Sequence, residues 1–100
     1  MNIKYNYGDS ILLDSFFNES VAKTIREIRQ QKNMSYAELS NKMNNKVSRQ
    51  TLCHYELNDT KIRIDTFKEI VVALEMTPKE LFDKINYNYF NEISNYSRKL

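Results

Sequence analysis

Four polar residues around position 50 have the types and spacing needed to hydrogen-bond to the edges of nucleobases. They are Arg49, Gln50, Thr51 and His54. Glutamine can bond bidentately to adenine, and arginine can do the same to guanine. In a helix, residues four apart share a face, so Gln50 and His54 would lie together with Arg49 one step around. The pattern predicts a polar, donor-rich helix face, with Arg49 and Gln50 as the first choices for base contacts and Thr51 and His54 next.

The same stretch carries apolar residues on its other side. Leu52 and Tyr55 would point into a core, together with Glu56. Ser48 precedes the stretch and can cap a helix over residues 49–57, because its side-chain oxygen accepts a bond from a free N–H of the first turn. The positive end of that helix would also favour a phosphate. The alternative is an ordinary solvated helix face, and Arg49 and Gln50 alone do not decide between the two.

The segment before this stretch predicts one long helix and one short one. A helix over residues 19–32 is expected, capped by Asn18 and ended by Asn33 in a left-handed conformation. The apolar stretch 11–17 is either a separate short helix or the start of a longer one. A capping box of Ser35 and Glu38 begins a short helix over residues 36–43.

The segment after the stretch predicts two further helices. Asn58 stands where a helix end needs positive φ. Asp65 is expected to cap a helix over residues 66–74. Thr77, Pro78 and Glu80 form the strongest start signal in the chain, with a cap, a proline at the first helical position and a completed capping box.

An apolar stripe continues to Leu100. Its members recur at spacings of four, four, three and four: Ile85, Tyr89, Ile93, Tyr96 and Leu100. The stripe either covers its own core, against residues 11–17, or contacts the same stripe on a second copy. We favour the second alternative, which makes these five residues candidate dimer contacts.

Composition favours one small all-α domain. One glycine and one proline in 100 residues are too few for the turns of an all-β fold. The single cysteine cannot form an internal disulfide, and no Cys/His cluster exists to bind a metal. No apolar run reaches the roughly 18–20 residues of a membrane span, and no secretion signal is present. We expect a cytoplasmic protein with no cofactor and no metal.

The charge is concentrated in the middle of the chain. Residues 20–63 carry nine basic and four acidic side chains, a net charge of +5, although the whole chain carries only +2. The flanking segments are slightly acidic. Such an asymmetry indicates one surface suited to a polyanion.

Residues 20–82 resemble the Cro/C1-type helix-turn-helix family of phage and bacterial repressors. The matching pattern is IREIRQQKNMSYAELSNKM…VSRQTLCHYELN…IDTFKEIVVALEMTPKELF. The resemblance implies a five-helix domain whose third helix enters the major groove of DNA. It divides the chain into an N-terminal extension (1–18), a DNA-binding domain (19–83) and a C-terminal amphipathic helical tail (84–100).

Three positions depart from the family pattern. The turn over residues 44–47 is about two residues longer than usual, which should shift the third helix slightly. Asn58 stands where the family usually has glycine, and Tyr36 where it commonly has glutamine. The resemblance also implies an internal ion pair between Arg29 and Glu56 that fixes the third helix to the scaffold.

Donors flanking the third helix would position it on the DNA backbone. The candidate phosphate contacts are Ser35, Tyr36, Lys46, Ser48, Asn58, Thr60 and Lys61. No catalytic constellation accompanies them, since His54 and Cys53 are adjacent and would point about 100° apart on a helix. We therefore expect a small transcriptional regulator, a repressor and homodimer, that binds double-stranded DNA. The alternative is a protein-interaction module with the same fold, such as an antitoxin or a partner of another regulator.

Overall fold

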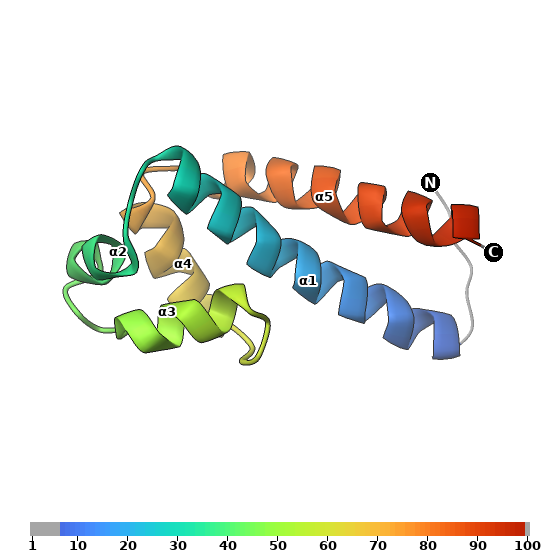
Figure 1. Cartoon of the computed structure of the whole chain (residues 1–100), viewed down its shortest axis with the longest axis horizontal. Helices are drawn as coiled ribbons and strands as arrows, with labels where there is room; N and C mark the ends of the chain where they lie inside the picture. The colour runs from blue at the N-terminus through green and yellow to red at the C-terminus, as the bar shows by residue number, and fades with distance from the viewer. Residues whose placement is uncertain (1–6, 100) are drawn as a thin grey trace.

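The computed structural model describes residues 7–99, with side chains from 15 to 97. This part of the chain contains no strand and five helices: α1 (Tyr7–Gln31), α2 (Tyr36–Lys42), α3 (Arg49–Glu56), α4 (Ile64–Ala73) and α5 (Pro78–Lys99). The two long helices, α1 and α5, lie side by side and antiparallel, and α2, α3 and α4 cluster beside the C-terminal half of α1 (Figure 1). This arrangement gives a molecule of 43 × 23 × 22 Å.

Helix α1 is longer than the capping pattern predicts. It begins at Tyr7, so Asn18 lies inside the helix and its assignment as a cap is wrong. The apolar stretch 11–17 starts a longer helix because Phe17, Val21 and Ile25 continue one helical stripe across position 18. Helix α1 and helix α5 run without a break through positions 18–19 and 83–84, where the sequence analysis divides the chain.

The predicted caps of α2, α3 and α5 are confirmed. The Oγ of Ser35 accepts a hydrogen bond from the N–H of Glu38, and the Oγ of Ser48 accepts one from the N–H of Thr51, both at 3.1 Å. Thr77 and Glu80 complete a reciprocal capping box, with two side chain–backbone bonds of 3.1 Å. The Glu38 carboxylate accepts instead from the hydroxyl of Ser35, at 3.2 Å, where a bond from the Ser35 N–H was expected.

Helix α4 begins two residues earlier than predicted. Its N-cap is Arg63, which makes no side-chain cap bond. Asp65 lies in the first turn, where its carboxylate accepts from the N–H of Thr66 at 2.9 Å, so its assignment as the cap is wrong. An acidic group in the first turn still stabilises the positive end of the helix.

Asparagine ends two helices in the left-handed conformation that the sequence predicts. Asn33 has a φ of 53° after α1, and Asn58 has a φ of 59° after α3. At the end of α3 the N–H of Asn58 donates to the carbonyl of Tyr55, and the N–H of Asp59 donates to that of His54. These two bonds form a Schellman motif, which satisfies carbonyls that the helix end leaves free.

The core takes side chains from all five helices. The most deeply buried are Ile25, Leu39, Leu52, Ile70, Leu74, Leu81 and Ile85, each at most 1% exposed. Val47, between α2 and α3, is half-buried against this core. The buried hydroxyl of Ser40 donates to the Val47 carbonyl at 2.6 Å and holds the turn in place. Among the helices that the structure describes, none is long and apolar enough to cross a bilayer.

The apolar stripe of α5 faces α1. The rings of Tyr89 and Phe17 meet edge to face with centroids 5.4 Å apart, and those of Tyr96 and Phe16 lie at the same distance. Ile85 is completely buried, so it has no surface for a second copy and its assignment as a dimer contact is wrong. Ile93 is half-buried, and Leu100 lies outside the described residues. The stripe therefore covers the chain's own core, the alternative that the sequence analysis left open.

Candidate nucleic-acid interface

Helix α3 has one anchored face and one bare face. On the anchored face Leu52, Tyr55 and Glu56 are only 1%, 9% and 7% exposed. On the other face Arg49, Gln50 and His54 are exposed, and Thr51 is half-buried. The polar residues that the sequence selects for base contacts thus share an accessible surface on one short, rigid helix.

Two of these side chains have their full donor capacity available. Arg49 and Gln50 make no hydrogen bond or ion pair to any side chain that the structure describes. The hydroxyls of Thr51 and Ser48 lie 3.0 Å apart and share a hydrogen bond at the start of the helix. His54 has a partner, because its Nδ1 lies 3.3 Å from a carboxylate oxygen of Asp59.

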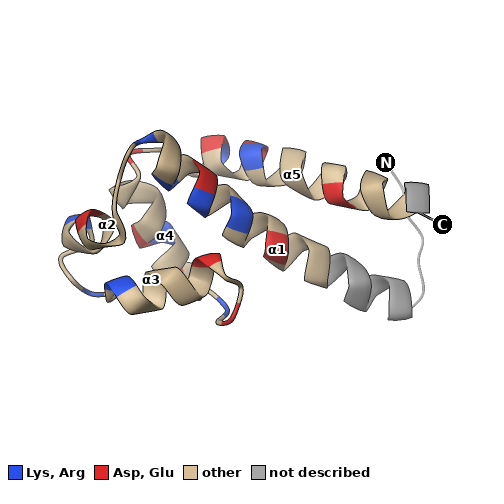
Figure 2. Ribbon diagram, in the orientation of Figure 1, with Lys and Arg blue, Asp and Glu red and all other residues tan. Residues whose placement is uncertain are grey.

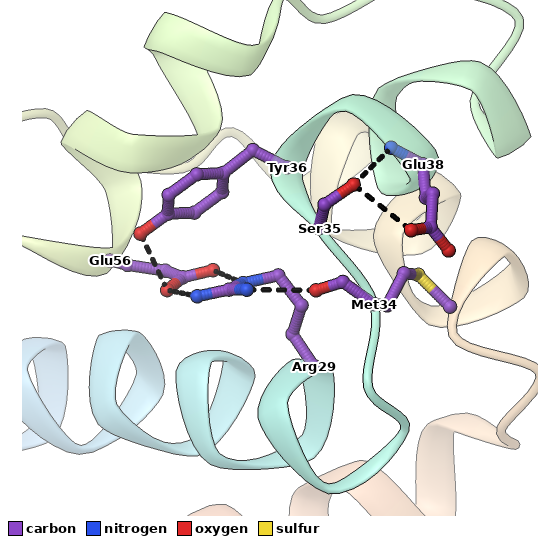
Figure 3. A network of polar contacts seen from close by, with 6 residues as sticks. All are labelled: Arg29, Met34, Ser35, Tyr36, Glu38 and Glu56. Carbon is purple, nitrogen blue, oxygen red and sulfur yellow. Dashed lines mark hydrogen bonds and ion pairs between the residues drawn. The ribbon is translucent and has the colours of Figure 1, made fainter.

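A buried polar network fixes the other face of α3 to α1 and α2 (Figure 3). Arg29 donates to both carboxylate oxygens of Glu56, from Nε at 2.7 Å and from its second amino nitrogen at 3.1 Å. Its remaining nitrogen donates to the carbonyl of Met34 at 2.8 Å. The ion pair that the family resemblance implies is therefore present, and it is bidentate, which fixes direction as well as distance.

Tyr36 belongs to this network. Its hydroxyl donates to Glu56 at 3.1 Å, and the Arg29 guanidinium lies over its ring at 4.1 Å from the centroid (Figure 3). The hydroxyl donor is thus engaged inside the molecule, which corrects the expectation of a phosphate contact from this side chain. Tyr36 instead links α2 to the carboxylate that anchors α3.

The electrostatics of the network favour a charged Arg29 and a neutral Tyr36. Hydrogen bonding to Glu56 is the main reason that the pKa of Arg29 is raised above its ordinary value, and burial opposes this effect. Burial is the main reason that the pKa of Tyr36 is raised, and the negative charge of Glu56 adds to it. Arg29 therefore stays charged and Tyr36 stays a neutral donor across the physiological range.

The other expected phosphate contacts lie on the surface. They are Ser35, Lys46, Ser48, Asn58, Thr60 and Lys61, all exposed. Figure 2 shows basic segments on α1 and at the start of α3. Lys46 pairs with Glu69 at 3.3 Å, and the hydroxyls of Ser35 and Ser48 already serve as helix caps. Lys61 makes no ion pair within the described part of the chain.

The groups exposed on α3 are suited to binding a ligand. Within the described residues, no group of three or more histidine, cysteine, aspartate or glutamate side chains could hold a metal ion. Cys53 is a half-buried free thiol beside His54 on α3. Every polar group on the bare face of α3 suits hydrogen bonding to a ligand edge.

Sequence reasoning gave one member of the site the wrong role and missed another. Tyr36 was expected to contact a phosphate, because its position at the start of α2 does not reveal that its hydroxyl reaches Glu56. Asp59 was not selected at all. Its signal was present, because a left-handed Asn58 ends α3 with a motif that brings Asp59 back to His54.

Comparisons with known proteins agree with this fold and site. A family model described as helix-turn-helix matches residues 25–81. A crystal structure of a point mutant of the Restriction-Modification Controller Protein C.Esp1396I matches with a TM-score of 0.70 and 24% sequence identity. The match covers 75% of this chain and 97% of that one. At this identity the likeness shows the fold alone, and no curated protein sequence matches the chain.

The family match spans more than half of the chain and includes α2, the turn, α3 and α4 in full. It covers the buried network and the bare face of α3 in one continuous segment. The chain belongs to the Cro/C1-type helix-turn-helix family, a family of DNA-binding regulators.

Proposed function

We propose that this protein binds double-stranded DNA sequence-specifically by inserting α3 into the major groove. The observation that carries the proposal is the division of α3 into two faces. Leu52, Tyr55 and Glu56 anchor it to the scaffold, while Arg49 and Gln50 stay exposed and without partners among the described side chains. A helix fixed to the scaffold on one face can present its other face to base edges with little further loss of backbone conformational entropy.

The base contacts follow from the donors on the bare face. Arg49 in the first turn can donate two bonds to guanine O6 and N7, and Gln50 can pair bidentately with adenine N6 and N7. Thr51 and His54 supply further contacts. Ser35, Lys46, Ser48, Asn58, Thr60 and Lys61 would position the helix on the backbone, with Lys46 exchanging Glu69 for a phosphate.

Repression is the regulatory mode that we propose. A protein that occupies promoter DNA can block transcription by exclusion alone. The resemblance to phage and bacterial repressors supports the same mode. A cytoplasmic location remains an expectation from sequence.

Dimer formation is part of the proposal, but on a surface other than the predicted stripe. A half-open cleft of about 240 Å³ lies between α1, α4, α5 and the loop after α3, and Ile64 and Phe82 line it. These two side chains are 81% and 43% exposed. A second copy covering them would give an isologous contact. Two copies of α3 would then read half-sites about 34–36 Å apart along the duplex.

Binding to duplexes selected from random DNA tests the proposed function. Affinity for the selected duplex and for a scrambled duplex is measured at two or more salt concentrations. We expect preference for the selected duplex and a log–log slope of about −0.9 for each phosphate contacted. A protein-interaction module would show little binding and no such slope, and that result would reject DNA recognition.

A further inference from the structure

Asp59 is an acidic residue beside the proposed DNA surface. A carboxylate there weakens binding, because it repels the phosphates that Lys61 and its neighbours would attract. The side chain of Asp59 is 56% exposed, and its partner is His54 on the bare face of α3. The contact joins Nδ1 of the imidazole to Oδ2 of the carboxylate, 3.3 Å apart.

The backbone holds this pair together. The left-handed Asn58 turns the chain back at the end of α3, and the N–H of Asp59 donates to the carbonyl of His54 at 3.0 Å. The two residues are thus joined by a backbone bond and by a side-chain bond. Their proximity follows from the helix-ending motif, so it does not depend on two mobile side chains meeting at the surface.

The pairing decides which hydrogen bond His54 can offer. In a neutral imidazole one ring nitrogen carries a proton, and the partner of that nitrogen selects the tautomer. A carboxylate at Nδ1 selects the Nδ1–H form, which leaves Nε2 as an acceptor. In the major groove, the base groups that donate to an acceptor are the amino groups of adenine and cytosine.

We infer that Asp59 is a positioning residue for sequence recognition, holding His54 so that its Nε2 accepts a hydrogen bond from the amino group of an adenine or a cytosine. The inference rests on the proposed insertion of α3 into the major groove. In this base contact His54 is the acceptor, and Asp59 itself touches no base.

The tautomer can be measured without DNA. His54 is the only histidine, so a ¹⁵N-histidine label gives the spectrum of one residue. At pH 8 the long-range proton–nitrogen correlations should show the Nδ1–H form in the parent protein. Asp59→Ala should shift the population toward the Nε2–H form. The same tautomer in both proteins would overturn the inference.

Recognition is then tested with the duplex selected from random DNA, its single base-pair substitutions and a scrambled duplex. His54→Ala should reduce discrimination at one base pair per half-site, by about tenfold. Asp59→Ala should lose discrimination at the same base pair, while its affinity for the scrambled duplex stays equal or increases. The double variant should match His54→Ala, because the two residues act through one contact.

Two results would overturn the inference. Asp59→Ala could change affinity for every duplex by the same factor, or its effect could add to that of His54→Ala. Asp65→Asn is the matched control, since it removes an exposed charge from the neighbouring segment but leaves His54 untouched, and discrimination should not change. If no duplex is preferred over the scrambled one, sequence recognition fails as a whole, and the tautomer measurement still reports on the His54–Asp59 pair separately.

Discussion

The two faces of α3 differ in how their polar groups are satisfied. On the anchored face, Glu56 accepts three hydrogen bonds from Arg29 and Tyr36, and its side chain is 2% exposed. On the bare face, Arg49 and Gln50 make no bond to any described side chain. Helix α3 therefore has its orientation set by one face and keeps its hydrogen-bonding capacity on the other.

The two faces of this eight-residue helix should therefore have different roles. Changes on the anchored face should affect stability first, because they leave buried groups without partners. Changes on the bare face should affect DNA recognition and leave stability nearly unchanged. Each substitution below tests one side of this comparison.

The largest effect is expected from Glu56→Ala. It leaves the Arg29 guanidinium, 11% exposed, and the Tyr36 hydroxyl without their acceptor. Removal of one partner from a buried ion pair costs about 3–5 kcal/mol. Urea unfolding should show this loss of stability, and base preference should be affected less. A variant that unfolds like the parent but binds DNA poorly would assign Glu56 to the interface instead.

Arg49→Ala and Gln50→Ala should show the opposite behaviour. Each removes an exposed side chain, so the free energy of unfolding should change by less than about 0.5 kcal/mol. Discrimination at the base pair that each residue reads should fall by about 1–3 kcal/mol. Competition binding with single base-pair substitutions measures this loss. If either variant is destabilised as strongly as Glu56→Ala, the two faces do not differ as described.

Tyr36→Phe should have an intermediate effect on stability. The ring and its contact with Arg29 are kept, and only the hydroxyl bond to Glu56 is lost. We expect a loss of about 1 kcal/mol at neutral pH, measured by urea unfolding. A loss of DNA affinity at unchanged stability would instead return the hydroxyl to the phosphate contacts.

Tyr36→Phe also tests how the stability of the protein depends on pH. The pKa of Tyr36 is raised in the folded protein, mainly by burial. Its contribution to stability is therefore complete below the unfolded pKa, roughly 10, and is lost as pH rises through the folded pKa. The stability of the parent should fall more steeply than that of Tyr36→Phe above about pH 10. Parallel curves would contradict this assignment.

Lys61→Ala should have the smallest effect and should not change base preference. One phosphate contact fewer reduces the salt slope by about 0.9 and weakens binding to all duplexes alike. Lys79→Ala is the matched control, because Lys79 pairs with Asp83 on α5, away from α3. The salt dependence of binding distinguishes the two variants. An equal slope change in both would mean that the effect is one of net charge.

Local signals in the sequence identified most helix ends. Ser35, Ser48 and Thr77 were recognisable because a cap bonds within three residues of itself, so the sequence contains both partners. Asn18 and Asp65 have the same chemistry but fail as caps. The apolar stripe continues through Asn18, and Asp65 bonds to its neighbour inside a turn that has already begun. Tertiary packing decided both positions.

The candidate site could be predicted only where its geometry is local. The exposed face of α3 follows from the helical period, which places Gln50 and His54 opposite Leu52. The Arg29–Glu56 pair, 27 residues apart, came from the family resemblance and not from spacing. Tyr36 could not be assigned, because its direction depends on how α2 packs on α3. The burial of Ile85 likewise depends on the pairing of α1 with α5.

Guanine N7 protection tests the central claim most directly, because N7 lies in the major groove and the bare face of α3 should cover it. Methylation of the selected duplex by dimethyl sulfate should be blocked in two patches one helical turn apart. Arg49→Ala, which should fold like the parent, should restore methylation at one guanine in each patch. Protection confined to the minor-groove N3 of adenine, or an N7 pattern that Arg49→Ala leaves unchanged, would contradict the reading of DNA by α3.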